Sequence, residues 1–227
     1  MAESPEHRPL PLPHLRPAVA AAWIAAMAVL FGALAADLVV HGPVTRLDPT
    51  ASRWFAMHLD PSTTRLMLAI SAMHATVPIC ILAALLAIGL VATGQRPWVA
   101  LLVLAVPGGL VLNAVVKLAF ERARPAFDHP LVHLSTFSFP SGHAAGATVW
   151  WGFALVLWWS RERGLAARMA GVLVAVAIVA LTAVSRVYLG AHYPSDVLAG
   201  IAEGTLWLLA CISGAKAVAQ HRAGAIA

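Results

Sequence analysis

Charged side chains are scarce in this chain. Only 11% of its 227 residues are Asp, Glu, Lys or Arg, whereas 60% are hydrophobic. Soluble domains carry about 25% charged residues, so this composition excludes an ordinary soluble domain and indicates a membrane protein. The net charge of +5 is not gathered into a basic stripe or tail, and this argues against nucleic acid as a partner.

Cysteine and clustered carboxylates are also lacking. The two cysteines, Cys80 and Cys211, each fall inside an apolar run and have no partner pattern of a disulfide or metal site. We interpret both as small packing residues. The ten Asp and Glu residues form no cluster of the kind that holds a metal ion, so we expect neither a metal nor another cofactor.

What the chain has in abundance is long apolar stretches. A helix needs about 20 apolar residues to cross a bilayer, and six stretches approach or exceed this length. They predict an all-α fold, an integral membrane six-helix transmembrane bundle. The stretches are Ala18–Val40, Leu66–Ala92, Trp98–Phe120, Ala144–Trp159, Met169–Val187 and Val197–Ala219.

The ends and one loop differ from this apolar body. Residues 1–17 are rich in proline and polar side chains and are predicted to be disordered, residues 18–219 form the six-span domain, and residues 220–227 form a short tail. Arg16, the apolar run and Ala33-Leu-Ala35 within the first stretch resemble a signal peptide with a cleavage site, but the length of the stretch favours an uncleaved helix. In the loop after it, the aromatic, amphipathic piece Arg53–Leu59 is predicted to lie along the bilayer surface.

Orientation follows from the basic residues on the two sides of a six-span arrangement. One side carries eight Lys and Arg residues. The other side carries seven, but three of these belong to the candidate phosphate site described below, which leaves four. The positive-inside rule then places both termini in the cytoplasm. All segments of the candidate site share the opposite, outer face.

The first of these segments is Lys117-Leu-Ala-Phe-Glu-Arg-Ala-Arg124-Pro125. Lys117 and Arg124 are seven residues apart, about two helical turns, which predicts that both lie on one helix face until Pro125 ends the helix. Taken alone, this pair is also what two snorkelling cations at a membrane edge would look like.

The second segment, Pro140-Ser141-Gly142-His143, stands just before an apolar run. Ser141 and Gly142 at a helix start leave backbone N–H groups free and allow an anion to approach closely. Taken alone, Pro-Ser-Gly is an ordinary turn, and His143 could be an interfacial or capping histidine.

The third segment holds Arg186, His192 and Asp196. The spacing of four would let the Asp196 carboxylate accept the Nδ1 proton of His192 and leave Nε2 free as a nucleophile. The planar fork of Arg186 suits two oxygens of one phosphate. Taken alone, the His-Asp pair is equally a local structural hydrogen bond.

Together, the segments read Lys-x6-Arg-Pro, Pro-Ser-Gly-His and Ser-Arg-x5-His-x3-Asp. In this the chain resembles the type 2 phosphatidic acid phosphatase (PAP2) superfamily, and its six-span layout resembles the membrane branch of small bacterial members. The resemblance implies that His192 forms a phosphohistidine, that Asp196 orients it and that His143 is the general acid. It also implies that Lys117, Arg124 and Arg186, with Ser141 and the Gly142 amide, hold the phosphate without a metal.

The expected function is therefore hydrolysis of a lipid phosphate or diphosphate at the outer face of a bacterial inner membrane. Candidate substrates are undecaprenyl diphosphate, phosphatidylglycerophosphate and phosphatidate. The alternatives are a lipid phosphotransferase with the same phosphohistidine and a non-catalytic lipid carrier. Among the other polar residues, Arg122 is predicted to face away from Arg124, Glu203 to face the bundle interior, and His74 to be interfacial.

Overall fold

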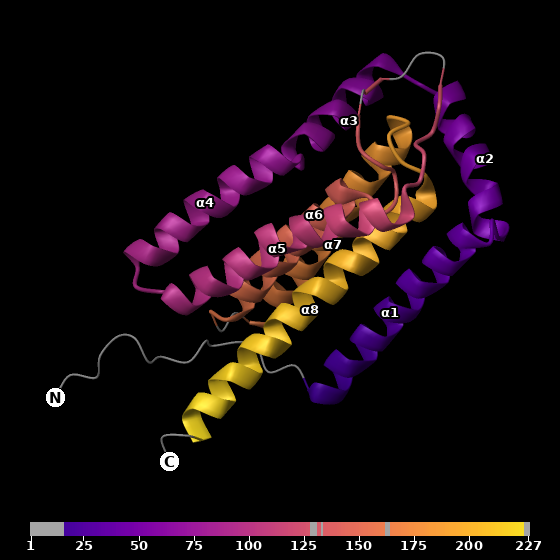
Figure 1. Cartoon of the computed structure of the whole chain (residues 1–227). Helices are drawn as coiled ribbons and strands as arrows, with labels where there is room; N and C mark the ends of the chain where they lie inside the picture. Colours follow the sequence, from indigo (N-terminus) through magenta and orange to yellow (C-terminus); the bar gives the residue numbers. More distant parts are fainter. Residues whose placement is uncertain (1–15, 128–130, 133, 162–163, 225–227) are drawn as a thin grey trace.

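The regular structure of the described chain consists of eight helices (Figure 1). The computed structural model describes residues 16–127, 131–132, 134–161 and 164–224, and every regular element within these ranges is an α-helix. The predicted all-α class is confirmed, whereas the count of six helices is not. Most of the predicted segment 1–17 and the last part of the predicted tail lie outside the described residues. The helices are α1 (Pro17–Val39), α2 (Pro43–Met57), α3 (Pro61–Met73), α4 (Thr76–Ala92), α5 (Arg96–Phe120), α6 (Gly142–Trp159), α7 (Leu165–Tyr188) and α8 (Pro194–Gly224).

Several of these helices have the length and apolarity of membrane spans. In the described chain, α1, α5, α7 and α8 each qualify, and α3 with α4, bent by 48° where they meet, form a further candidate. Their outward faces are apolar, with Val29 71%, Val111 64% and Leu173 66% exposed. Apolar surface of this extent is stable against lipid rather than water. The chain is an integral membrane protein.

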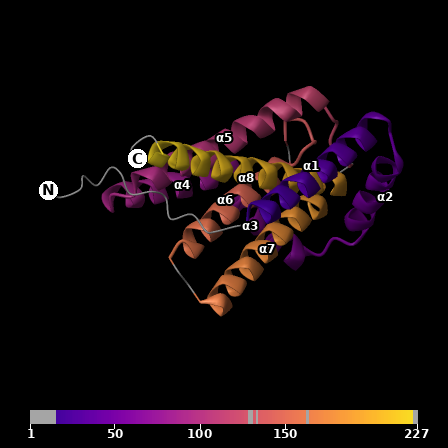
Figure 2. The same ribbon diagram turned by 90° about the horizontal axis from the view of Figure 1, so that it is seen from below.

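Helix α6 accounts for the difference from the predicted six spans. Its 18 residues begin with Gly142 and His143 and include four tryptophans, and it is not among the candidate spans. It packs against α5, α7 and α8, and Ala144, Ala147 and Phe153 are fully buried. Figure 2 shows α8 running between α5 and α7. Helix α6 is therefore an interior helix of the bundle.

Two glycines let α8 approach α6 closely. A Cβ atom on Gly200 would lie 2.5 Å from the carbonyl oxygen of Ser141. One on Gly204 would lie 2.7 Å from the carbonyl oxygen of Ala145. Residues four apart share a helix face, so this is a small-xxx-small contact of the kind that membrane helices use. It holds the start of α6 against the start of α8, which carries Asp196.

Two predicted segments differ from the structure. The stretch predicted as one span from Leu66 to Ala92 is broken at His74 and Ala75 into α3 and α4. Pro78 lies in the first turn of α4, where its missing N–H is tolerated, so the helix restarts there. The predicted loop after α1 contains the 15-residue helix α2, with Asp48 and Ser52 buried on one face. Its position along the bilayer surface stays a prediction.

Candidate active site

The last turn of α5 places Lys117 inside the bundle. Lys117 is 9% exposed, and its Nζ donates to the carbonyl oxygen of Phe137 at 2.7 Å and lies 3.4 Å from that of Ser138. A buried ammonium keeps its charge only where acceptors or anions surround it. Four charged groups are near enough to interact electrostatically with Lys117. They are Arg124, Arg186, Asp196 and Glu203.

Arg124 reaches the site from a loop, not from the helix predicted for it. Helix α5 ends at Phe120, where Glu121 takes a left-handed conformation with φ 45°, so the prediction that Lys117 and Arg124 share a helix face is wrong. Arg124 Nη1 donates to the carbonyl oxygen of Ala191 at 2.6 Å and lies 3.2 Å from His192 Nε2. The guanidinium is thus beside the imidazole nitrogen predicted to react.

The turn before α6 is tied to both neighbouring segments. Ser141 is the N-cap of α6 and is completely buried, and its backbone N–H donates to the carbonyl oxygen of Asp196 at 2.9 Å. A Cβ atom on Gly142 would lie 2.9 Å from Asn113 Oδ1 and 3.8 Å from Lys117 Cε. The small residue therefore leaves room beside the lysine for close approach to the backbone.

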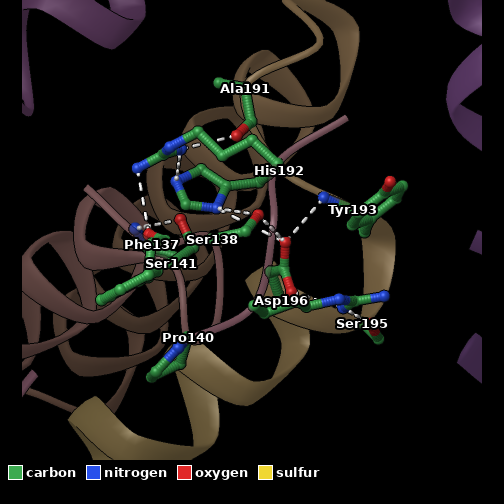
Figure 3. Close-up of polar contacts among 12 residues, drawn as sticks. Phe137, Ser138, Pro140, Ser141, Ala191, His192, Tyr193, Ser195 and Asp196 are labelled. Atoms are coloured by element: carbon green, nitrogen blue, oxygen red, sulfur yellow. Dashed lines mark hydrogen bonds and ion pairs between the residues drawn. The ribbon is translucent and has the colours of Figure 1, made fainter. Parts of the chain in front are cut away.

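His192 lies between Arg124 and Asp196. Its Nδ1 is 3.6 Å from Asp196 Oδ2, a long contact, and 3.4 Å from Ser138 Oγ. Ser138 Oγ donates to the same carboxylate oxygen at 2.5 Å, and the backbone N–H of Tyr193 donates to it at 2.8 Å. Figure 3 shows His192, Ser138 and Asp196 pointing toward one another. The predicted His192–Asp196 pair is therefore shared with a serine that sequence analysis missed.

Burial sets the protonation state of this histidine. It lowers the pKa of His192 to about 4; Asp196 opposes this effect, while Arg124 and Lys117 add to it. The imidazole is thus neutral at pH 7 and Nε2 keeps its lone pair.

Burial also lowers the pKa of Arg124. Burial lowers the pKa of Arg122 as well, but Asp196 and Asp48 outweigh it, so that its pKa rises.

Arg186 and His143 complete the set. Arg186, at the end of α7, is 2% exposed, and its Nη1 donates to the hydroxyl of Ser71 on α3. Its Nε and Nη2 are buried and have no hydrogen-bond partner among the described residues. His143, in the first turn of α6, is half-buried and lies near Arg186 and His192.

The predicted site residues lie at the ends of α5 and α7, at the starts of α6 and α8 and in the adjoining loops. These meet at the end of the bundle opposite the start of α1 and the end of α8 (Figure 1). The structure also adds residues that the sequence did not indicate. Arg122, predicted to face elsewhere, does not point to His192 but pairs with Asp196 and with Asp48 on α2. No spacing signal connects Asp48 with the three segments, because the connection exists only after folding.

Two further polar residues lie in the interior. Glu203 is 4% exposed and accepts a hydrogen bond from Asn113 Nδ2 at 2.7 Å, so it faces the bundle as predicted. His74, predicted to be interfacial, is 7% exposed. Its Nε2 accepts a hydrogen bond from Trp151 Nε1 at 3.0 Å. His74, at the end of α3, therefore packs against α6; its depth relative to the membrane interface stays a prediction.

Comparison with known proteins identifies the family. A model described as the PAP2 superfamily matches residues 96–218. The chain belongs to the PAP2 superfamily. The resemblance inferred from the three segments is thereby confirmed, and all the predicted site residues of this PAP2 chain fall within the matched range.

Individual relatives share this core. Phosphatidylglycerophosphatase B of Bacillus subtilis is 41% identical over 119 residues, 49% of this chain and 56% of that protein. Decaprenylphosphoryl-5-phosphoribose phosphatase of Mycobacterium tuberculosis is 37% identical over 118 residues, 48% of this chain and 56% of that protein. The PAP2 chain thus matches about half the length of these relatives. A crystal structure of a transmembrane PAP2-type phosphatidylglycerolphosphate phosphatase from Bacillus subtilis has a TM-score of 0.72 and 30% identity, covering 84% of this chain and 94% of that one.

Proposed function

We propose that the protein is a membrane lipid phosphatase that hydrolyses a phosphomonoester or pyrophosphate headgroup through a phosphohistidine on His192. The main observation in support of this proposal is the environment of the Arg186 guanidinium. Arg186 is 2% exposed, and two of its nitrogens have no protein acceptor within the described chain. A buried cation of this kind is costly unless an anion accepts its N–H groups, and its planar fork fits two oxygens of one phosphate.

The surrounding residues suggest how the reaction proceeds. His192 Nε2 attacks phosphorus, the bond from phosphorus to the leaving oxygen breaks, and His143 donates a proton to that oxygen. Water then attacks phosphorus while His143 takes a proton from the water. The P–N bond breaks, its electron pair returns to Nε2, and inorganic phosphate leaves. Asp196 and Ser138 keep the proton of His192 on Nδ1. Lys117, Arg124, Arg186, Ser141 and the Gly142 N–H stabilise the charge on the phosphoryl oxygens.

The substrate class follows from where the site lies. The end of an apolar bundle is where a headgroup can enter while its lipid tail stays in the bilayer. The relatives are named for phosphatidylglycerophosphate and decaprenylphosphoryl-5-phosphoribose, both phosphorylated lipids. Undecaprenyl diphosphate, phosphatidylglycerophosphate and phosphatidate are the candidates for this chain.

The experiment is phosphate release from a panel of these lipids by the purified protein in detergent. We expect release that persists in excess EDTA, because cations of the chain and not a metal neutralise the phosphate, and inhibition by orthovanadate. Activity lost on chelation and restored by a divalent metal would contradict the mechanism. Transfer of phosphate to an added acceptor lipid in place of water would make the protein a phosphotransferase, and binding without turnover would make it a carrier.

We further propose that the protein lies in a bacterial inner membrane with its site facing the periplasm or outside. The excess of basic residues that the sequence predicts on the side opposite the site supports this orientation. In a variant without Cys80 and Cys211, Ser135→Cys at the site end should react with an impermeant maleimide in intact spheroplasts. Gly164→Cys, between α6 and α7, should react only after lysis. The reverse pattern would overturn the orientation.

A further inference from the structure

A buried polar network connects α2 with the start of α8. Asp48, on the inner face of α2, is 2% exposed. Its Oδ1 accepts the backbone N–H of Ser195 at 3.1 Å, and its Oδ2 accepts the hydroxyl of the same serine. Oδ2 also accepts Arg122 Nη2 at 2.7 Å. Both carboxylate oxygens of Asp48 are therefore directed at residues that adjoin Asp196.

Arg122 carries this network to the carboxylate beside the predicted nucleophile. Its Nη1 donates to Asp196 Oδ1 at 2.5 Å and to Ser195 Oγ at 2.7 Å. Its guanidinium carbon lies 4.3 Å from the centre of the Tyr193 ring, a cation–π contact. With Asp48 on one arm and Asp196 on the other, the fork of Arg122 can take only one orientation.

The two oxygens of Asp196 are thus held by different groups. Oδ1 accepts from Arg122, while Oδ2 accepts from Ser138 and from the Tyr193 N–H and faces His192 Nδ1. Fixing Oδ1 prevents the carboxylate from rotating, so that Oδ2 keeps its place beside the imidazole. Groups that orient a reactive histidine through its carboxylate partner affect turnover more than binding.

We propose that Asp48 is a positioning residue: it locks Arg122, and through Arg122 the orientation of Asp196. This inference rests on the proposed role of Asp196. Asp48 lies outside the residues 96–218 that match the family. It is the member of the network that comes from α2, an element that carries none of the three motif segments. A simpler role, anchoring α2 to the bundle, must be separated from it.

Asp37 offers a matched control for anchoring. It also holds α2 in place, because its Oδ2 accepts the backbone N–H and the hydroxyl of Thr45 at 2.7 and 2.8 Å. It makes no hydrogen bond to Asp196 or Ser195 in the described chain. Asp48→Asn should lower kcat about 10- to 30-fold and leave KM within about twofold, because substrate contacts are unchanged. Asp37→Asn should lower kcat less than about twofold.

The second readout is the combination of Asp48→Asn with Asp196→Asn. If Asp48 acts through Asp196, the double variant should be within about twofold of Asp196→Asn alone, since coupled residues are not additive. A full additional loss in the double variant, or equal losses in Asp48→Asn and Asp37→Asn, would show anchoring only and overturn the inference. Wild-type turnover of Asp196→Asn would overturn the proposed mechanism itself, and with it this inference. Melting curves in detergent verify that each variant is folded.

Discussion

The two halves of the chain contribute to the candidate site in different ways. Helices α5–α8 and their loops carry every residue proposed to touch the phosphate. Helices α1–α4 carry none of these, yet Asp48 on α2 and Ser71 on α3 bond the two arginines that connect to the site, Arg122 and Arg186. The residues with a chemical task lie in one half, and the other half supplies acceptors that orient them.

This difference has a physical cause. A phosphate needs cations, N–H donors and a nucleophile, so the reacting half is restricted to particular residue types at recognisable spacings. An arginine held in place needs only an oxygen at the right position, which a serine, an aspartate or a backbone carbonyl can supply. Supporting residues therefore have no pattern of their own until the helices pack.

The largest expected effect tests the reacting half alone. His192→Ala should lower kcat at least about 1,000-fold, because the group that forms the covalent intermediate is gone. Rapid quenching with radiolabelled lipid phosphate should trap an acid-labile, base-stable phosphoprotein in the wild type and none in the variant. His221→Ala, at the other end of α8, is the control and should be fully active. Near-normal turnover of His192→Ala would contradict the mechanism.

Much of the fold could be predicted from the sequence, but the breaks between helices could not. Scarce charge and long apolar stretches predicted an all-α membrane protein. They did not predict the bend between α3 and α4, because Leu66–Ala92 was interpreted as one apolar stretch although Pro78 lies close to the break. Nor did they predict that α6 is interior, since an apolar run looks the same whether it faces lipid or other helices.

The site was predictable as a set of residues and not as a geometry. The three segments predicted which side chains would gather at one end of the bundle. The route of Arg124 was missed because Glu121 leaves the helix with φ 45°, a conformation uncommon for residues other than glycine. Ser138 was missed because a serine two residues before a Pro-Ser-Gly turn has no distinguishing context before Asp196 folds against it.

Arg186 lies where the two halves meet, and its replacement should have the second-largest effect. Arg186→Lys keeps the charge but loses the fork that can bind two phosphate oxygens, so kcat/KM should fall about 100-fold. Arg168→Lys, at the opposite end of α7, is the matched control and should change kcat/KM less than about twofold. Full activity of Arg186→Lys would mean that only the positive charge matters. The buried guanidinium fork of Arg186 would then no longer support the proposed function.

Ser138 should have a smaller effect, because Asp196 Oδ2 keeps a second donor in the Tyr193 N–H. Ser138→Ala removes the hydroxyl between His192 and Asp196 and should lower kcat about 10-fold, with KM little changed. The exposed Ser135→Ala in the same loop serves as the control. A change confined to KM would indicate that the Ser138 hydroxyl contacts the substrate and not the carboxylate.

The smallest effect should come from Ser71, the acceptor that the first half supplies to Arg186. Ser71→Ala leaves Nη1 of Arg186 without its neutral acceptor, but a bound phosphate still holds Nε and Nη2, so kcat/KM should fall only about threefold. Ser62→Ala is a close control, since Ser62 lies on the same helix and accepts a hydrogen bond from Arg65 at 3.3 Å on an exposed surface. It should have no measurable effect. If Ser71→Ala were as damaging as Arg186→Lys, the first half would set the position of the phosphate-binding arginine instead of merely supporting it.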